Sequence, residues 1–81
     1  MNMTPKEAKA FIALADIIES TVKDMTSDGP GAPSEVIWNG LWPLGVSLAT
    51  YQSTIQFLKD RGIIREETDV LYHVGAEAAR S

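Results

Sequence analysis

The side chains best suited to chemistry lie between Ser47 and Lys59, where apolar residues recur at helical spacing. We expect Tyr51, Ile55 and Leu58 to point inward. The outward residues are then Ala49, Thr50, Gln52, Ser53, Gln56 and Lys59. Amides and hydroxyls both donate and accept hydrogen bonds, so this small, almost uncharged face suits the reading of base edges in a DNA groove. The other interpretation is a solvated helix face that happens to be neutral, and both stay open.

Other kinds of chemistry have little support in the sequence. The chain has one histidine, His73, and no cysteine, which is too few ligands for a usual transition-metal site. Glu66, Glu67 and Asp69 lack the spacing of a calcium loop. The serines have no triad context, because no nucleophile-elbow motif is present. We therefore expect no enzyme, no metal and no cofactor, and we expect His73 to be a packed or surface residue.

The elements that position these residues must fit in 81 residues, which is enough for one domain. Hydrophobic residues make up 44% and charged residues 22%, as in ordinary globular proteins. The net charge of −4 is spread along the chain, so there is no basic half for nucleic acid. The apolar runs are too short for a membrane span and no signal peptide is visible, so we expect a cytoplasmic protein.

The first expected element is a helix over residues 5–25. Thr4 can cap it, Pro5 suits its first position, and Glu7 completes a capping box. Leu14 and Ile17 widen its apolar stripe beyond what one small core needs. Either the rest of the chain covers this helix, or Leu14 and Ile17 form a homodimer interface.

The remaining pattern predicts a mainly α fold with a small β-hairpin. Glycines and prolines in residues 26–33 predict a loop that is neither helix nor strand. A helix over 34–42 follows, with Trp38 and Trp42 expected in the core. Ser47 caps a helix over 48–61 that buries Leu48 and stops at Gly62. Residues 63–74 read as a hairpin with its turn at 66–69, and residues 75–81 as a tail.

The segment from Leu44 to Ile55 resembles the helix-turn-helix signature of bacterial winged-helix regulators. That signature has a glycine in the turn, then an apolar residue and a serine, and Gly45, Val46 and Ser47 match it. Residues 58–64 are similar to the end of the recognition helix and the first wing strand, and the resemblance covers about residues 34–74. It implies a winged helix-turn-helix, with three helices and a two-stranded wing, that binds double-stranded DNA to regulate transcription. The candidate DNA-binding residues are Ser47, Ala49, Thr50, Gln52, Ser53, Gln56, Lys59 and Arg65.

The sequence departs from this pattern at the expected tip of the wing. Winged helices usually place basic residues there to hold phosphates, whereas this chain has Glu66, Glu67 and Asp69. Leu48 also stands where a polar residue is usual. The alternative is therefore a protein-interaction module built on the same scaffold, favoured by the acidic charge and the acidic wing.

Overall fold

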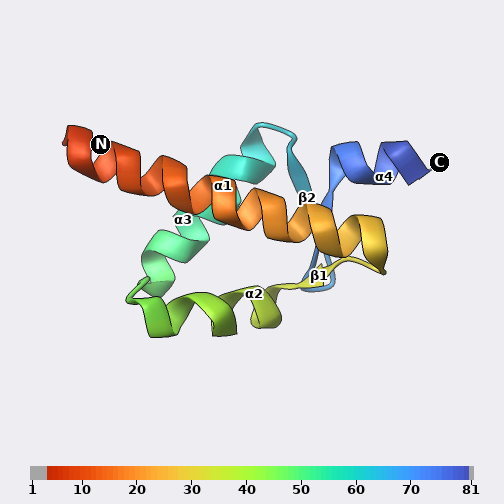
Figure 1. The fold of residues 1–81 in the computed structure, drawn as a ribbon, viewed down its shortest axis with the longest axis horizontal. Helices are drawn as coiled ribbons and strands as arrows, with labels where there is room; N and C mark the ends of the chain where they lie inside the picture. Colours follow the sequence, from red (N-terminus) through yellow and green to blue (C-terminus); the bar gives the residue numbers. More distant parts are fainter. Residues whose placement is uncertain (1–3, 81) are drawn as a thin grey trace.

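The longest helix, α1 (Pro5–Asp28), crosses the length of the molecule in the computed structural model, which describes residues 4–80 (Figure 1). Its N-cap is confirmed: the Thr4 hydroxyl accepts a hydrogen bond from the Glu7 amide at 3.2 Å. The helix continues three residues beyond the predicted end at 25. Thr26, in the last turn, is buried and its hydroxyl donates to the Val22 carbonyl at 2.7 Å. Packing thus extends a helix into a segment for which local composition predicted a loop.

The prediction that residues 26–33 form neither helix nor strand is also wrong at their other end. Ala32–Pro33 form strand β1, which pairs antiparallel with β3 (Val70–His73). Because β1 lies at an edge of the sheet, Pro33 is tolerated although it has no amide hydrogen to donate. The sheet therefore has three strands, in the order β1-β3-β2, where the sequence predicted two.

The β-hairpin pairs β2 (Ile64–Glu67) with β3, and its turn is shorter than predicted. Glu67 lies opposite Val70, so only Thr68 and Asp69 form the turn. Both have positive φ, 52° and 63°, which a two-residue type I′ hairpin turn requires. The carboxylates at positions 66 and 67 consequently lie on a strand and point to opposite faces of the sheet.

The predicted tail is a helix, α4 (Val74–Arg80). His73, the residue before α4, caps it locally: the Ala76 amide donates to Nδ1 of His73 at 3.1 Å, and Ala76 is buried. Nε2 of His73 lies 3.2 Å from Oε2 of Glu19 on α1. His73 is thus a packed residue, as expected, and it joins α1 to the start of α4.

The middle of the chain folds into α2 (Ser34–Leu41), the short 3-10 helix η1 (Trp42–Leu44) and α3 (Leu48–Asp60). The expected place of Trp42 in the core is wrong, because α2 buries the stripe formed by Ile37 and Leu41 and leaves Trp42 58% exposed. Leu48 is likewise 52% exposed, since the first residue of α3 extends beyond the core.

The end of α3 follows the prediction. Gly62 has φ 71°, and its amide donates to the Lys59 carbonyl while the Ile63 amide donates to the Leu58 carbonyl, both at 3.0 Å. These are the two hydrogen bonds of a Schellman motif. The chain therefore turns from α3 directly into the hairpin.

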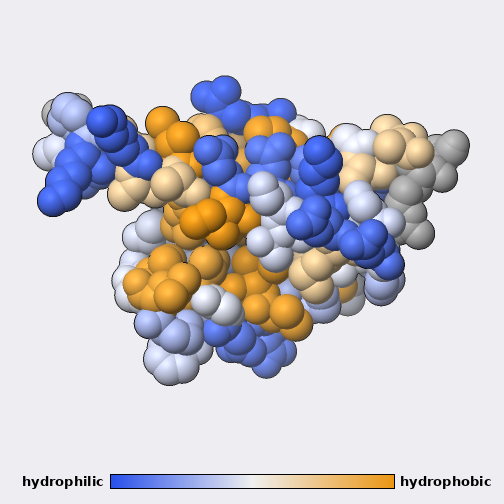
Figure 2. All heavy atoms as spheres, viewed as in Figure 1, coloured by the Kyte–Doolittle hydropathy of each residue, from blue (hydrophilic) through white to orange (hydrophobic). Residues whose placement is uncertain are grey.

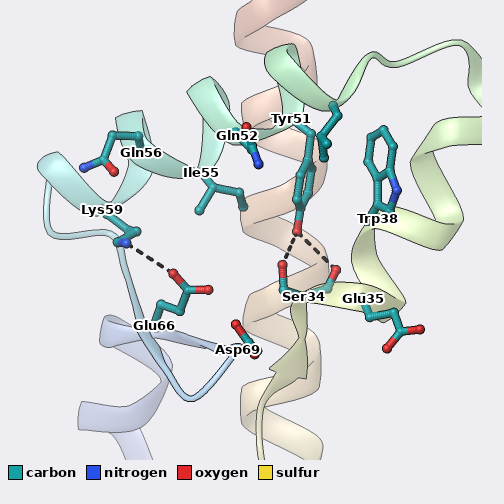
Figure 3. A pocket seen from close by; sticks show the side chains of 11 residues that line it. Ser34, Glu35, Trp38, Tyr51, Gln52, Ile55, Gln56, Lys59, Glu66 and Asp69 are labelled. Carbon is teal, nitrogen blue, oxygen red and sulfur yellow. Dashed lines mark hydrogen bonds and ion pairs between the residues drawn. The ribbon is translucent and has the colours of Figure 1, made fainter.

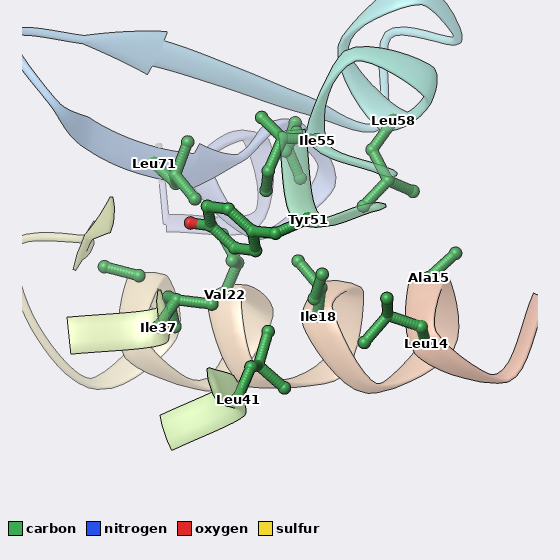
Figure 4. Close-up of a cluster of buried hydrophobic side chains, with 12 residues drawn as sticks. Leu14, Ala15, Ile18, Val22, Ile37, Leu41, Tyr51, Ile55, Leu58 and Leu71 are labelled. Atoms are coloured by element: carbon green, nitrogen blue, oxygen red, sulfur yellow. The ribbon is translucent and has the colours of Figure 1, made fainter. Parts of the chain in front are cut away.

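The hydrophobic core lies between α1 and the other elements (Figure 4). Ile18 and Val22 of α1 meet Leu41 of α2, Leu58 of α3 and Leu71 of β3, and all five are buried. The molecule is mostly helical with a small antiparallel sheet, so the coarse fold class is confirmed. Within residues 4–80, no helix combines the length and the apolar character that crossing a bilayer demands.

Candidate nucleic-acid interface

The start of α3 is set by a tight turn and a helix cap. Gly45 has φ 90°, a left-handed conformation that glycine adopts without steric cost, and its amide donates to the Trp42 carbonyl at 3.0 Å. The Ser47 hydroxyl accepts from the Thr50 amide at 3.1 Å and lies 2.9 Å from the Thr50 hydroxyl. Ser47 is therefore the N-cap, as predicted, and its hydroxyl is occupied within α3.

The exposed face of α3 carries most of the predicted DNA-binding residues. Tyr51, Ile55 and Leu58 are buried, which confirms the predicted inward stripe. The side chains on the outer face are exposed, except for the half-buried Lys59: Ala49, Thr50, Gln52, Ser53, Gln56 and Lys59. The Gln56 amide donates to Oδ1 of Asp60 at 2.7 Å. Seven of the eight candidates, counting Ser47, thus belong to one helix.

Arg65, the eighth candidate, is directed away from this face. Its Nε and Nη2 donate to the two carboxylate oxygens of Glu77 at 2.7 and 2.8 Å, and Nη1 donates to Glu67 at 2.8 Å. The guanidinium also lies 4.2 Å from the ring centroid of Tyr72. Hydrogen bonding to Glu77 raises the pKa of Arg65, and the same contact lowers the pKa of Glu77. The structure therefore uses Arg65 to hold α4 against the sheet.

A groove lies beside α3, bounded by the start of α2 and by the hairpin (Figure 3). Its volume is about 450 Å³. Trp38, Tyr51 and Ile55 contribute apolar walls, and Glu35 faces it from α2. The remaining lining residues come from Ser34, from α3 and from the hairpin: Leu48, Gln52, Gln56, Lys59, Glu66 and Asp69.

The charges in this groove are mainly negative. Nζ of Lys59 lies 3.2 Å from Oε1 of Glu66, so these two charges neutralise each other. Glu35 and Asp69 remain, and neither has an ion-pair partner among the described residues. The sequence indicated an acidic hairpin, but it gave no sign that Glu35, Trp38 and the hairpin share one groove.

The Tyr51 hydroxyl fixes α3 against the start of α2. It donates to the Ser34 carbonyl at 3.2 Å and lies 2.8 Å from Oγ of Ser34. The ring of Tyr51 is 5.3 Å from that of Trp38, centroid to centroid. Burial raises the pKa of Tyr51 above its usual value of 10.0; the Ser34 hydrogen bond lowers it by less, and the Glu66 charge raises it further.

The Tyr51→Phe variant should lose about 1 kcal/mol of stability at neutral pH, because the hydrogen bonds between the Tyr51 hydroxyl and Ser34 disappear. It should also respond differently to alkali. The folded state holds the proton of Tyr51 more tightly than the unfolded state, so this stability is complete below about pH 10 and declines as the pH rises further. Urea unfolding between pH 8 and 11 should therefore show a smaller decline in Tyr51→Phe. A Tyr72→Phe control keeps Tyr51, and an equal decline in both variants would contradict the prediction.

The two residues expected at a dimer interface differ in exposure. Leu14 is 9% exposed and belongs to the core, so it has little surface left for a second subunit, whereas Ile17 is 54% exposed. Ile17 shares a small groove with the exposed Val36 and Leu44, and Figure 2 shows apolar side chains gathered where α1 and α2 meet.

No group of three or more potential metal ligands occurs within residues 4–80. In comparisons with protein-family models, with curated proteins and with solved structures, the chain has no significant match.

Proposed function

We propose that this protein is a small winged helix-turn-helix protein that binds double-stranded DNA through α3. The order of the elements supports the winged-helix assignment: a helix, a strand, two helices and a hairpin, with β1 pairing to the last strand. The corrected topology, with β1 as a third strand, suits this fold as well as the predicted two-stranded wing did. In this proposal α3 is the recognition helix and the β2–β3 hairpin is the wing.

The observation that carries the proposal is the outer face of α3. The turn at Gly45 and the cap at Ser47 fix its first turns, and Thr50, Gln52 and Ser53 are exposed on them without charge. A recognition helix meets base edges through its N-terminal turns. Glutamine pairs with adenine, and threonine can contact the methyl group of thymine.

Binding by a single copy should be weak and sensitive to salt. Phosphate contacts supply most of the affinity of DNA-binding proteins, but Lys59 and Arg65 are already paired with carboxylates of the same chain. A two-fold dimer would double the contacts, and Ile17 is the exposed residue of α1 that we propose for its interface.

Sequencing the bound fraction of a random duplex pool, at low and at physiological salt, tests the proposal. We expect a short site that persists at physiological salt, and a palindromic site would report a dimer through its half-site spacing. Binding that enriches no sequence and disappears with salt would contradict a regulator that reads DNA.

The Gln52→Ala/Gln56→Ala variant should lose preference for the selected site. Each lost pairing to a base should cost about 1–3 kcal/mol, or roughly 5- to 150-fold in affinity, while affinity for unrelated duplex stays the same. Competition binding measures the ratio of the affinity for the selected site to the affinity for unrelated duplex. Asn39→Ala removes an exposed amide from α2 and should leave the ratio unchanged. An unaltered preference in the double variant would show that α3 is not the reading element.

The second candidate function is a protein-interaction module on the same scaffold. The groove beside α3 favours it, because the carboxylates of Glu35 and Asp69, which have no ion-pair partner among the described residues, repel a phosphate backbone. The net charge of −4 acts in the same direction.

A further inference from the structure

We propose that the groove between α2, α3 and the hairpin binds an extended segment of a partner protein that alternates arginine with apolar residues. This inference rests on the second candidate function and does not need DNA binding. The volume of the groove, about 450 Å³, lies within the range of sites that bind small molecules. A groove of this volume can also hold a few side chains of a peptide.

The charge of the groove selects a cationic occupant. Glu66 is neutralised by Lys59 at 3.2 Å, so Glu35 on one wall and Asp69 on the hairpin set the net charge. Figure 3 shows the Asp69 carboxylate across from Gln52 and Ile55, and Glu35 beside Ser34 at the start of α2. A guanidinium entering here would make charge-assisted hydrogen bonds with carboxylates that have no ion-pair partner among residues 4–80.

The apolar walls explain why we expect a peptide rather than a free cation. Leu48 is 52% exposed on the first turn of α3, although it is large and hydrophobic. Trp38 packs against Tyr51 and its ring also lines the groove. An aromatic face attracts an arginine placed over it, and the exposed Leu48 offers surface to an apolar residue beside that arginine.

Arginine is a better fit than lysine for the same walls. A guanidinium is planar, stacks on aromatic rings and can bind a carboxylate through two parallel hydrogen bonds, whereas an ammonium group is a strongly hydrated point charge. A strand-like segment would also direct alternate side chains to opposite sides. Its arginines would then face Glu35 and Asp69 while an apolar residue faces Leu48.

Trp38 provides an internal reporter for the test. In a Trp42→Phe background it is the one remaining tryptophan, so its emission reports the groove. The probe is an acetylated and amidated octapeptide of alternating arginine and leucine, added at low salt. We expect the Trp38 emission to change saturably as the peptide is added. We also expect the unlabelled peptide to displace a fluorescent copy of the same peptide from the protein.

Two double variants with equal change in net charge separate the groove from general attraction. Glu35→Gln/Asp69→Asn should weaken peptide binding by about tenfold or more. Asparagine tolerates the left-handed conformation at position 69 as aspartate does, so the turn is kept. Asp16→Asn/Asp24→Asn removes two exposed carboxylates from α1, outside the groove, and should bind like the parent.

Equal affinity of the two double variants would overturn the proposal, whether both are weakened or neither is. A duplex oligonucleotide that changes Trp38 emission and excludes the peptide would also overturn it, since the groove would then be a DNA surface. Failure of the duplex selection leaves the peptide result unaffected, so the two proposals fail separately.

Discussion

Replacing Gly31 with alanine is expected to destabilise the protein by about 2–4 kcal/mol. Gly31 precedes β1 and has φ 111°, a conformation that residues with a side chain rarely adopt. An added Cβ would lie 2.7 Å from Cε1 of Tyr72 and 2.9 Å from Cγ1 of Val70. Both are residues of β3, so relief of the clash would separate β1 from the sheet. Urea unfolding followed by circular dichroism measures the loss.

Gly40 is the matched control for this substitution. It lies within α2 and an added Cβ would meet nothing within 4 Å. Alanine in a helix is favoured over glycine by about 1 kcal/mol, so Gly40→Ala should stabilise the protein slightly. The same substitution should thus have opposite signs at positions 31 and 40, and a shift in the same direction at both would refute this account of β1.

The Leu71→Ala variant should have the second large effect, a loss of about 2–5 kcal/mol. Leu71 lies on the central strand and is completely buried against the core between α1 and the sheet. A domain of this size has only roughly 4–12 kcal/mol of stability in total. The variant should therefore unfold at much lower temperature, and below its melting point it should lose order first in the hairpin that β3 carries.

Ile12→Ala is the control for Leu71→Ala. It removes about as many side-chain atoms as Leu71→Ala does, but Ile12 is 58% exposed on α1. Its effect should stay within about 0.5 kcal/mol, because no cavity forms. Thermal unfolding of both variants gives the comparison, and similar melting temperatures would mean that Leu71 is not part of the packed core.

The positions where local hydrogen bonds decide the structure could be predicted from the sequence. Thr4, Ser47 and Gly62 begin or end helices through bonds to residues three to five positions away, so their neighbours in the chain are sufficient evidence. The inward stripe of α3, which includes Tyr51 and Leu58, follows equally from helical periodicity. The candidate reading face on the outside of α3 therefore also follows from the sequence.

Contacts between distant segments of the chain decided the features that local sequence did not predict, namely strand β1 and helix α4. Ala32 becomes a strand residue because Leu71, far along the chain, offers it a backbone partner, and α4 is held to the sheet because Arg65 of β2 binds Glu77. A prediction from neighbouring residues cannot include such partners, because long-range contacts stabilise a strand or helix only after distant segments of the chain have come together.

The same distinction applies to the charges of the candidate site. The sequence by itself determined that the hairpin is acidic and that α3 has a neutral outer face. Only the tertiary structure decided that Arg65 turns toward α4, that Lys59 is neutralised by Glu66, and that Glu35 joins Asp69 at one groove. The reason is physical: the type of a side chain is encoded locally, whereas the charge available to a partner depends on which neighbours the fold brings within a few ångströms.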